Sequence, residues 1–419
     1  MMNRRQALAT GAAAAAAAMP INRAAAQGGG EVTIGICFPF SGSGAQVGVD
    51  ARHAIETALD VINNPHPDLD LSLAKGSGLP GLGGAKLKIV AADHQSDPQK
   101  GRAEAERLIT QDKVPAIIGS YQSAVAATIS QTCERYAVPY LASDNSAPSL
   151  TKRGLKFIFR PGAQDEMFSG AMFDFLDALK KKGQKVETLA IFAEDTIFGT
   201  DSATVQRKLA GERGYKVVAD VKYRANAPSL TAEVQQLKAG NADVLLPSSY
   251  TTDGILLVKT MAELGYKPNA ILAQDAGFSE KALYDAVGQQ IVGCMTRGSF
   301  SLDLAAKRPM VGKVNEMYKA RSGKDFSDLS SREFMAMIVL AEAIDRAKAA
   351  DGAKIRDALA AIDIPGEQTI MPWTRVKFDE TGQNTFANPV LLQWTGEKFV
   401  TIYPETAAVA EANYPMAKG

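Results

Sequence analysis

Short apolar runs alternate with segments of helical spacing along most of the chain. The runs are rich in Val, Ile, Leu and Ala, and the segments between them repeat apolar residues at helical intervals, as Ile55, Leu59 and Ile62 do. The pattern predicts strands at 32–38, 87–92, 114–118, 138–142, 157–160, 188–193, 216–221, 243–247, 270–273, 374–378 and 390–394. Strands that alternate with helices over this length are typical of doubly wound parallel sheets, an α/β fold with helices on both faces.

The strand–helix pattern begins twice, once at Val32 and again near Thr188, which predicts two similar lobes rather than one large sheet. A chain of 419 residues is long enough for two domains of ordinary size. When two such lobes face each other, the loops at the carboxyl ends of their strands form opposite walls of one cleft.

The first 26 residues have the three parts of a bacterial export signal. Arg4 and Arg5 are followed by an Ala-rich apolar run and by three small residues, 24–26, before Gln27. A buried Ala-rich helix would explain neither the paired arginines nor the small residues, so we favour export and expect a periplasmic protein. The residues after Arg5 fit the twin-arginine (Tat) consensus only in part, so Tat and Sec export both stay open.

Charge and apolar content exclude several classes of partner. The chain has 46 basic and 46 acidic residues, and loss of the predicted signal removes three arginines, which leaves a slightly acidic protein. Such a protein has no electrostatic attraction to nucleic acid or to an anionic membrane. No apolar run of the length that spans a bilayer follows the signal, so we expect no direct insertion into a membrane.

Cysteine and histidine usage argues against a metal site. Cys37, Cys133 and Cys294 lie far apart in apolar patterns, which predicts buried free thiols. The three histidines show no paired spacing, so we expect neither a structural nor a catalytic zinc site, and no cofactor.

Two loops rich in hydroxyl and amide side chains follow neighbouring predicted strands. The run 114–118 leads through Gly119 into the loop 120–123 and a helix, and the run 138–142 leads into the loop 143–148. Strand, helix and strand form a βαβ unit whose parallel strands end at the same edge of the sheet, where helix N-termini present N–H groups to anions. We therefore predict a binding site for a group such as a carboxylate. Its candidate residues are Tyr121, Gln122, Ser123, Asp144 and Ser146.

A structural role is the alternative for the two serines. Ser123 could cap the helix that it precedes, but Ser120 and Gln122 could share that role, so we favour ligand contact. Ser146 has a weaker case, because the segment 145–148 would also suit a plain turn.

The second half of the chain offers a carboxylate and two aromatic rings at strand ends. Asp275 follows the apolar run 271–273 and would suit an ammonium group in a partly dry cleft, or would cap the helix after Ser279, and the sequence does not decide between these roles. Phe198 and Tyr250 lie at loop tips, where they would form the wall of a ligand site.

Catalysis has no support in the sequence. The segment 42–48 follows a strand and opens a helix, but its third glycine falls one residue late for a dinucleotide fingerprint, so we favour a loop that lets a ligand approach closely. Glu194 and Asp195 are adjacent and would point to opposite sides of a strand end. Because we find no nucleophile with a base and no metal motif, we do not expect an enzyme.

The chain resembles the leucine/isoleucine/valine-binding protein family, which comprises solute receptors of ABC transporters with the type I periplasmic binding protein fold. The resemblance covers residues 31 to about 405. It rests on the segments 40–42, 93–98, 119–123, 146–151, 198–199 and 377–382 and on Tyr250.

The resemblance implies roles for the candidate residues. Ser123 and the loop with Asp144 and Ser146 would hold the carboxylate of an amino acid, and Asp275 would hold its ammonium group. Tyr250 would close over the ligand and Phe198 would form an aromatic wall.

Two departures from the family pattern leave open whether the ligand is leucine. Leucine binders tend to place Trp on the first loop, where this chain has Val47 after Gln46, and Asp replaces Glu at position 275. Both changes leave room for a bulkier or shifted ligand. The alternative ligands are aromatic carboxylates or other small organic acids.

The resemblance also implies two Rossmann-like lobes joined by a three-strand hinge. We expect lobe 1 to comprise 27–156 and 285–355, and lobe 2 to comprise 157–284 and 356–419. The expected partners are a small-molecule ligand and an ABC permease, and we expect a monomer. A cytoplasmic amide-sensing regulator of the same fold is disfavoured by the export signal, and a dehydrogenase by the glycine spacing.

Overall fold

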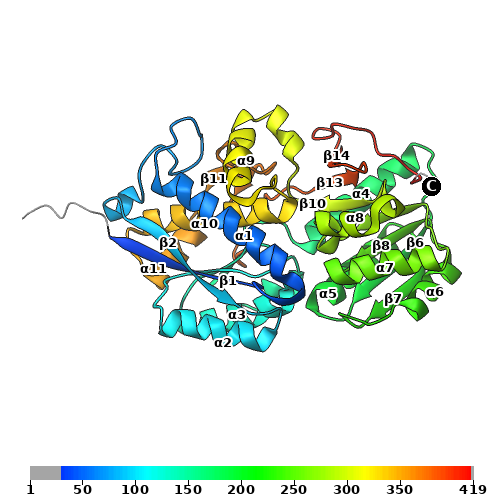
Figure 1. The fold of residues 1–419 in the computed structure, drawn as a ribbon, viewed down its shortest axis with the longest axis horizontal. Coiled ribbons are helices and arrows are strands. Elements are labelled where there is room, and N and C mark those ends of the chain that lie inside the picture. Colours follow the sequence, from blue (N-terminus) through cyan, green and yellow to red (C-terminus); the bar gives the residue numbers. More distant parts are fainter. Residues whose placement is uncertain (1–29, 417–419) are drawn as a thin grey trace, which may run out of the picture.

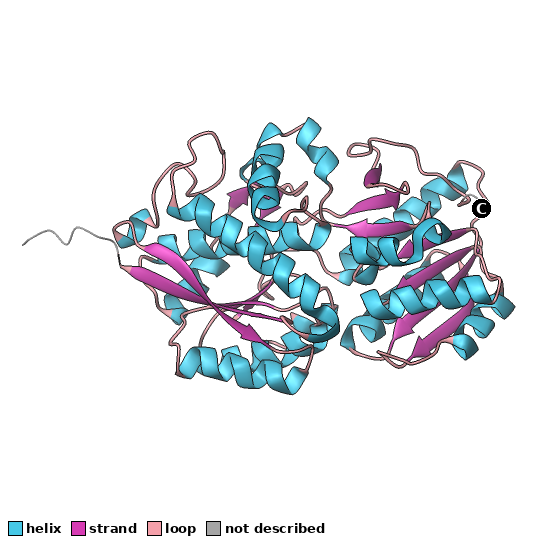
Figure 2. Ribbon diagram, viewed as in Figure 1, coloured by secondary structure: helices cyan, strands magenta, loops and turns pink. Residues whose placement is uncertain are grey.

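A computed structural model describes residues 30–416, so the predicted export signal at 1–26 lies outside the described residues. The chain forms two sheets, each covered by helices, which lie side by side along the longest axis of the molecule (Figures 1 and 2). The predicted α/β class is therefore confirmed. No helix in the range 30–416 is long and apolar enough to cross a membrane.

The first sheet is entirely parallel, with the order β2-β1-β3-β4-β5. Its strands are β1 (Glu31–Phe38), β2 (Lys86–Asp93), β3 (Ile117–Gly119), β4 (Tyr140–Ala142) and β5 (Ile158–Phe159). Successive side chains of β1 point to opposite faces: Ile36 and Phe38 enter one core, and Cys37 enters the other. This alternation is why the sheet needs helices on both sides.

The helices of the first lobe divide between those two faces. The core that holds Ile36 also holds α1 (Ala45–Asn63), α9 (Pro309–Ser322), α10 (Asp328–Ala347) and α11 (Gly352–Ala360). The core that holds Cys37 also holds α2 (Pro98–Thr110) and α3 (Ser123–Tyr136). All three cysteines are buried free thiols, as predicted.

The second sheet has the order β14-β13-β10-β9-β8-β6-β7, and its pairs are parallel except that β13 is antiparallel to both of its neighbours, β10 and β14. Its strands are β6 (Thr188–Glu194), β7 (Lys216–Tyr223), β8 (Val244–Ser248), β9 (Ala270–Ala273), β10 (Met295–Gly298), β13 (Val390–Trp394) and β14 (Phe399–Tyr403). The helices of this lobe are α4 (Asp165–Lys181), α5 (Ile197–Glu212), α6 (Thr231–Gly240), α7 (Thr251–Glu263) and α8 (Lys281–Val287). Separate apolar cores lie on its two faces.

Most predicted strands are confirmed, and the strands at 270–273 and 390–394 match to the residue. The predicted strand at 374–378 is reduced to β12 (Arg375–Val376), which pairs with β11 (Ile364–Pro365) and with neither large sheet. The strands β10, β11 and β14 were not among the predicted strands.

The chain returns to the first lobe later than predicted. Strand β10 lies beyond the predicted boundary at residue 285, yet it pairs with β9 and so belongs to the second sheet. Residues 356–389, predicted for lobe 2, contribute Ile364 and Trp373 to the core of the first lobe. The lobe boundaries predicted at 284–285 and 355–356 disagree with this pairing and packing, because the local sequence does not tell which sheet or core a segment near a boundary joins. We propose that lobe 1 comprises 30–160 and 299–389, and lobe 2 comprises 161–298 and 390–416.

A buried arginine, Arg160, lies close to the boundary predicted at 156–157 and is hydrogen-bonded to a later segment. The Arg160 backbone N–H donates to Gly382 O at 2.8 Å and its Nε donates to Gln383 Oε1 at 2.6 Å. The Asn384 N–H in turn donates to Arg160 O at 3.0 Å. Two of the segments that join the lobes thus run side by side, as hinge strands do.

Candidate functional site

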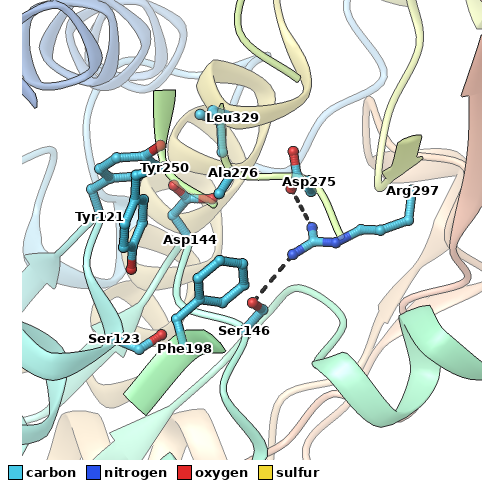
Figure 3. A pocket seen from close by; sticks show the side chains of 10 residues that line it. All are labelled: Tyr121, Ser123, Asp144, Ser146, Phe198, Tyr250, Asp275, Ala276, Arg297 and Leu329. Carbon is cyan, nitrogen blue, oxygen red and sulfur yellow. Dashed lines mark hydrogen bonds and ion pairs between the residues drawn. The ribbon is translucent and has the colours of Figure 1, made fainter. Parts of the chain in front are cut away.

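A narrow pocket lies between the two lobes, at the carboxyl ends of their strands, and side chains leave a free volume of only about 10 Å³ in it (Figure 3). Both lobes contribute to its wall. It is lined by Tyr121, Ser123, Asp144, Ser146, Phe198, Tyr250, Asp275, Ala276, Arg297 and Leu329. Seven of the ten candidate residues from the sequence meet here.

The hydroxyl groups of Ser123 and Ser146 lie on the first-lobe wall. Ser123 is the first residue of α3, and Gln122, which makes no side-chain cap bond, holds the N-cap position. The capping role considered for Ser123 is therefore wrong, and its side chain lines the pocket instead. Ser146 Oγ accepts a hydrogen bond from Arg297 Nη2 of the second lobe at 3.2 Å.

Three aromatic rings close one side of the pocket. The Tyr121 and Tyr250 rings, one from each lobe, meet edge to face with their centroids 5.0 Å apart, and Phe198 lies 5.3 Å from Tyr250. Burial raises the pKa values of both tyrosines well above the usual range, so their hydroxyl groups stay protonated and can donate hydrogen bonds. These contacts join the two lobes, so the structure shows the closed arrangement.

Asp275 lies at the other side of the pocket and is bonded to two arginines. Its Oδ2 accepts from Arg297 Nη1 of its own lobe and, at 2.8 Å, from Arg332 Nη2 of the first lobe. Its Oδ1 is buried and has no hydrogen-bond partner. Ala276 and Glu280 hold the N-cap positions of the two helices that follow, so the capping role considered for Asp275 is wrong.

The backbone at this corner is strained. Asp275 and Ala276 have φ values of 62° and 54°, in the left-handed region that non-glycine residues rarely adopt. Arg297 stacks on the Phe168 ring with the guanidinium carbon 3.6 Å from its centroid. Strain and stacking together fix the acid–arginine pair in one orientation.

Arg332 is the centre of a buried charge cluster. Besides Asp275, it contacts Asp144 Oδ1 and Asp328 Oδ2, each at 2.7 Å. Burial raises the pKa of Asp144 to about 7 and that of Asp328 to about 6, although the guanidinium group opposes the rise. Burial would lower the pKa of Arg332, but the three carboxylates raise it overall, so it stays charged.

A second, larger cavity of about 130 Å³ is also lined by the Tyr121–Tyr250 pair. Val47 and Gln122 line this cavity rather than the inner pocket. Gln46 lines neither: it is exposed and its Nε2 donates to Asp50 Oδ1 within α1 at 2.9 Å. The structure thus does not bring Gln46 to the site.

Neither arginine of the pocket was predicted from the sequence. Arg297 lies inside the short strand β10, and Arg332 lies in α10 just before a long apolar run. A charged residue inside an apolar element is a signal of a buried ion pair, but the sequence does not tell which acid it meets.

The acidic and metal-ligating residues within 30–416 form no evident metal site. No cluster of three or more His, Cys, Asp or Glu residues in that range could hold a metal ion. Glu194 is buried and accepts hydrogen bonds from the backbone of Thr196 and Gly199, whereas Asp195 is exposed, so the adjacent acids point apart as predicted.

Comparison with known proteins agrees with this geometry. The family model for periplasmic binding proteins matches residues 31–398. The Leu/Ile/Val-binding protein homolog 7 of Brucella abortus is 30% identical over 403 residues, which cover 94% of this chain and 96% of the relative.

Solved structures share the fold at lower identity. A leucine-binding protein LivK from Thermotoga maritima superimposes with a TM-score of 0.75 at 24% identity, over 90% of this chain and 99% of that one. An ABC-transporter solute-binding protein from Rhodopseudomonas palustris in complex with 3,4-dihydroxybenzoic acid has a TM-score of 0.72 at 18% identity, over 88% and 95% of the two chains. The chain therefore belongs to the periplasmic binding protein family and has the type I fold of its leucine/isoleucine/valine-binding members.

Proposed function

We propose that this protein is the exported receptor of an ABC transporter, and that its lobes close around a small carboxylate-bearing molecule, an amino acid in the first instance. The observation that carries the proposal is the closed pocket, to which each lobe contributes polar groups that meet only when the lobes are together. Arg297 Nη2 on Ser146 Oγ and Arg332 Nη2 on Asp275 Oδ2 both cross the cleft.

The wall near Ser123 and Ser146 is the part suited to a carboxylate. It combines two hydroxyl groups, the N-terminal end of α3 and the guanidinium group of Arg297. Hydrogen bonds to a charged group in such a dry site are stronger than those between neutral groups. The aromatic rings of Tyr121, Tyr250 and Phe198 would enclose the apolar part of the ligand.

The relatives support an amino acid without naming it. The Brucella relative is described as a Leu/Ile/Val-binding homolog and the Thermotoga structure as a leucine-binding protein. The predicted signal at 1–26 and the family support a periplasmic location, a permease as the partner and a monomeric receptor rather than an enzyme.

An aromatic or other amine-free acid is the second candidate. The specific observation in its favour is Asp275, whose Oδ2 already has two arginine donors, so the expected ammonium contact is partly filled by the protein. The Rhodopseudomonas neighbour is in complex with an aromatic acid.

A thermal-shift panel tests the proposal. The protein lacking residues 1–26 is heated with L-leucine, L-isoleucine, L-phenylalanine, benzoate or 3,4-dihydroxybenzoate. A ligand at 100 times its Kd should stabilise the fold by about 2.7 kcal/mol. Stabilisation by at least one of these acids is the expected result, and a panel with no effect at millimolar concentration would contradict the proposal.

A further inference from the structure

Glu280 is a buried acid of lobe 2 that faces lobe 1. It holds the N-cap position of α8, but its side chain makes no cap bond there. Only 8% of the residue is exposed, and its Oε1 is buried without a hydrogen-bond partner among the described residues. The helix that follows Glu280 thus gives no reason for a carboxyl group at this place.

The Glu280 side chain lies where the two lobes meet. It lines a cavity of about 10 Å³, about the space of one water molecule, and the rest of the cavity wall belongs to lobe 1. That wall consists of Val47, Asp50, Ala51, Ser327, Leu329, Ser330 and Glu333. Because lobe 1 supplies all of these residues, separation of the lobes would return the Glu280 carboxyl group to water.

Polar groups of this wall are already bonded within lobe 1. Ser327 and Ser330 form the capping box of α10, in which the Ser330 N–H donates to Ser327 Oγ at 3.1 Å and the Ser327 N–H donates to Ser330 Oγ at 2.9 Å. Lys324, a cation that attracts Glu280, donates to the two carboxylate oxygens of Asp50 at 3.2 and 3.0 Å. Closure therefore brings Glu280 beside another acid and leaves its Oε1 without a donor.

The ionised form of Glu280 is disfavoured in these surroundings. Burial raises its pKa from 4.5 to about 8, and repulsion by Asp50, Asp275 and Asp144 adds to the rise against the attraction of Lys324. The other titratable groups that face it are Tyr121, Tyr318 and Glu333. At neutral pH the Glu280 carboxyl group is therefore protonated between the closed lobes and ionised once it is in water.

We propose that closure of the two lobes takes up a proton at Glu280, so that acidification favours the closed arrangement and alkaline pH favours the open one. This inference rests on the proposed function of a closing receptor and adds regulation of that receptor by pH. Between about pH 4.5 and about pH 8 the closed arrangement binds more protons than the open one. The ratio of closed to open protein should therefore fall by up to about tenfold for each pH unit in this range.

Small-angle X-ray scattering of the ligand-free protein without residues 1–26, between pH 5.5 and pH 8.5, tests the proposal. The radius of gyration of the wild type should increase with pH as the lobes open. Glu280→Gln, which is neutral at every pH, should be more compact than the wild type at pH 8.5. Asp285→Asn is the matched control: Asp285 lies on the same helix, is exposed and pairs with Lys281, so its profile should equal that of the wild type.

A wild-type radius that does not change with pH, or that decreases as pH rises, would overturn the inference. Equal radii for Glu280→Gln and the wild type at pH 8.5 would also overturn it, because other acids such as Asp144 would then account for the pH dependence. Should that variant fail to fold, Asp50→Asn removes the first of the repelling charges and should likewise be more compact than the wild type at pH 8.5, and an unchanged radius would contradict the inference.

The same measurement separates this inference from the receptor function. Compaction by an acid of the thermal-shift panel at constant pH, together with a ligand-free radius that does not depend on pH, would overturn the role of Glu280 and leave the receptor function standing. A radius that responds neither to pH nor to any acid of the panel would contradict both.

Discussion

The two lobes contribute different chemistry to the same pocket. The first-lobe loops bring the hydroxyls of Ser123 and Ser146 and an acid, Asp144, that has few donors. The second lobe brings Asp275, whose Oδ2 the protein itself has already bonded to two arginines. An acid at a strand end is thus not automatically free for a ligand.

Removal of Arg332 should have the largest effect on stability, because three buried acids would lose the cation that they share. Arg332→Leu should lower the free energy of unfolding by about 3–5 kcal/mol at pH 8, measured with urea. Arg346→Leu is a control on the same helix: Arg346 is exposed and pairs with Glu342, so its loss should cost less than about 1 kcal/mol. Equal losses of unfolding free energy in the two variants would mean that the charge cluster around Arg332 does not stabilise the fold.

Loss of the Ser123 hydroxyl should weaken ligand binding but leave folding unchanged. Ser123 caps no helix, so Ser123→Ala should leave the melting temperature of the ligand-free protein nearly unchanged. Its affinity for the best acid of the panel should fall by about 1.5–3 kcal/mol, the range for hydrogen bonds to charged groups, as measured by calorimetry. A variant that melts earlier yet binds normally would assign Ser123 to the fold alone.

The acid of the first lobe should destabilise the closed arrangement of the lobes at high pH. Burial in the closed arrangement raises the pKa of Asp144 to about 7 against an ordinary value of 3.8. The closed arrangement should therefore lose stability relative to an open one as pH rises from about 4 to about 7. Asp144→Asn should favour closure by about 1 kcal/mol or more at pH 8, which should reduce the radius of gyration of the ligand-free protein in small-angle scattering, and this gain should shrink towards pH 4. A variant more open than wild type at pH 8 would show that Asp144 is well paired by the protein.

The smallest expected effect belongs to Gln46. Its side chain is exposed, bonds to Asp50 in its own helix and reaches neither cavity. Gln46→Ala should therefore change ligand affinity and unfolding free energy by less than about 0.5 kcal/mol. A larger loss of affinity would show that the N-terminal end of α1 contributes to ligand binding.

The fold could be predicted from the sequence because local patterns determine strands such as β9 and β13. The lobe boundaries could not, because only long-range pairing and packing assign β10 and the segment around Trp373 to one lobe or the other. Ser123, Asp144 and Ser146 were predictable for the same local reason, since each follows a strand that ends at the cleft. Arg297 and Arg332 were not, because their partners lie far away in the sequence.

The central claim is that two lobes close around a charged small molecule. Small-angle X-ray scattering of the protein without residues 1–26 tests it directly, with and without saturating amounts of the tightest acid of the panel. Because the cross-cleft contacts of Arg332 and Tyr250 describe a closed arrangement, the ligand-free protein should open and the ligand should reduce its radius of gyration. An identical scattering profile in both states, with binding shown by calorimetry on the same sample, would contradict a closing receptor.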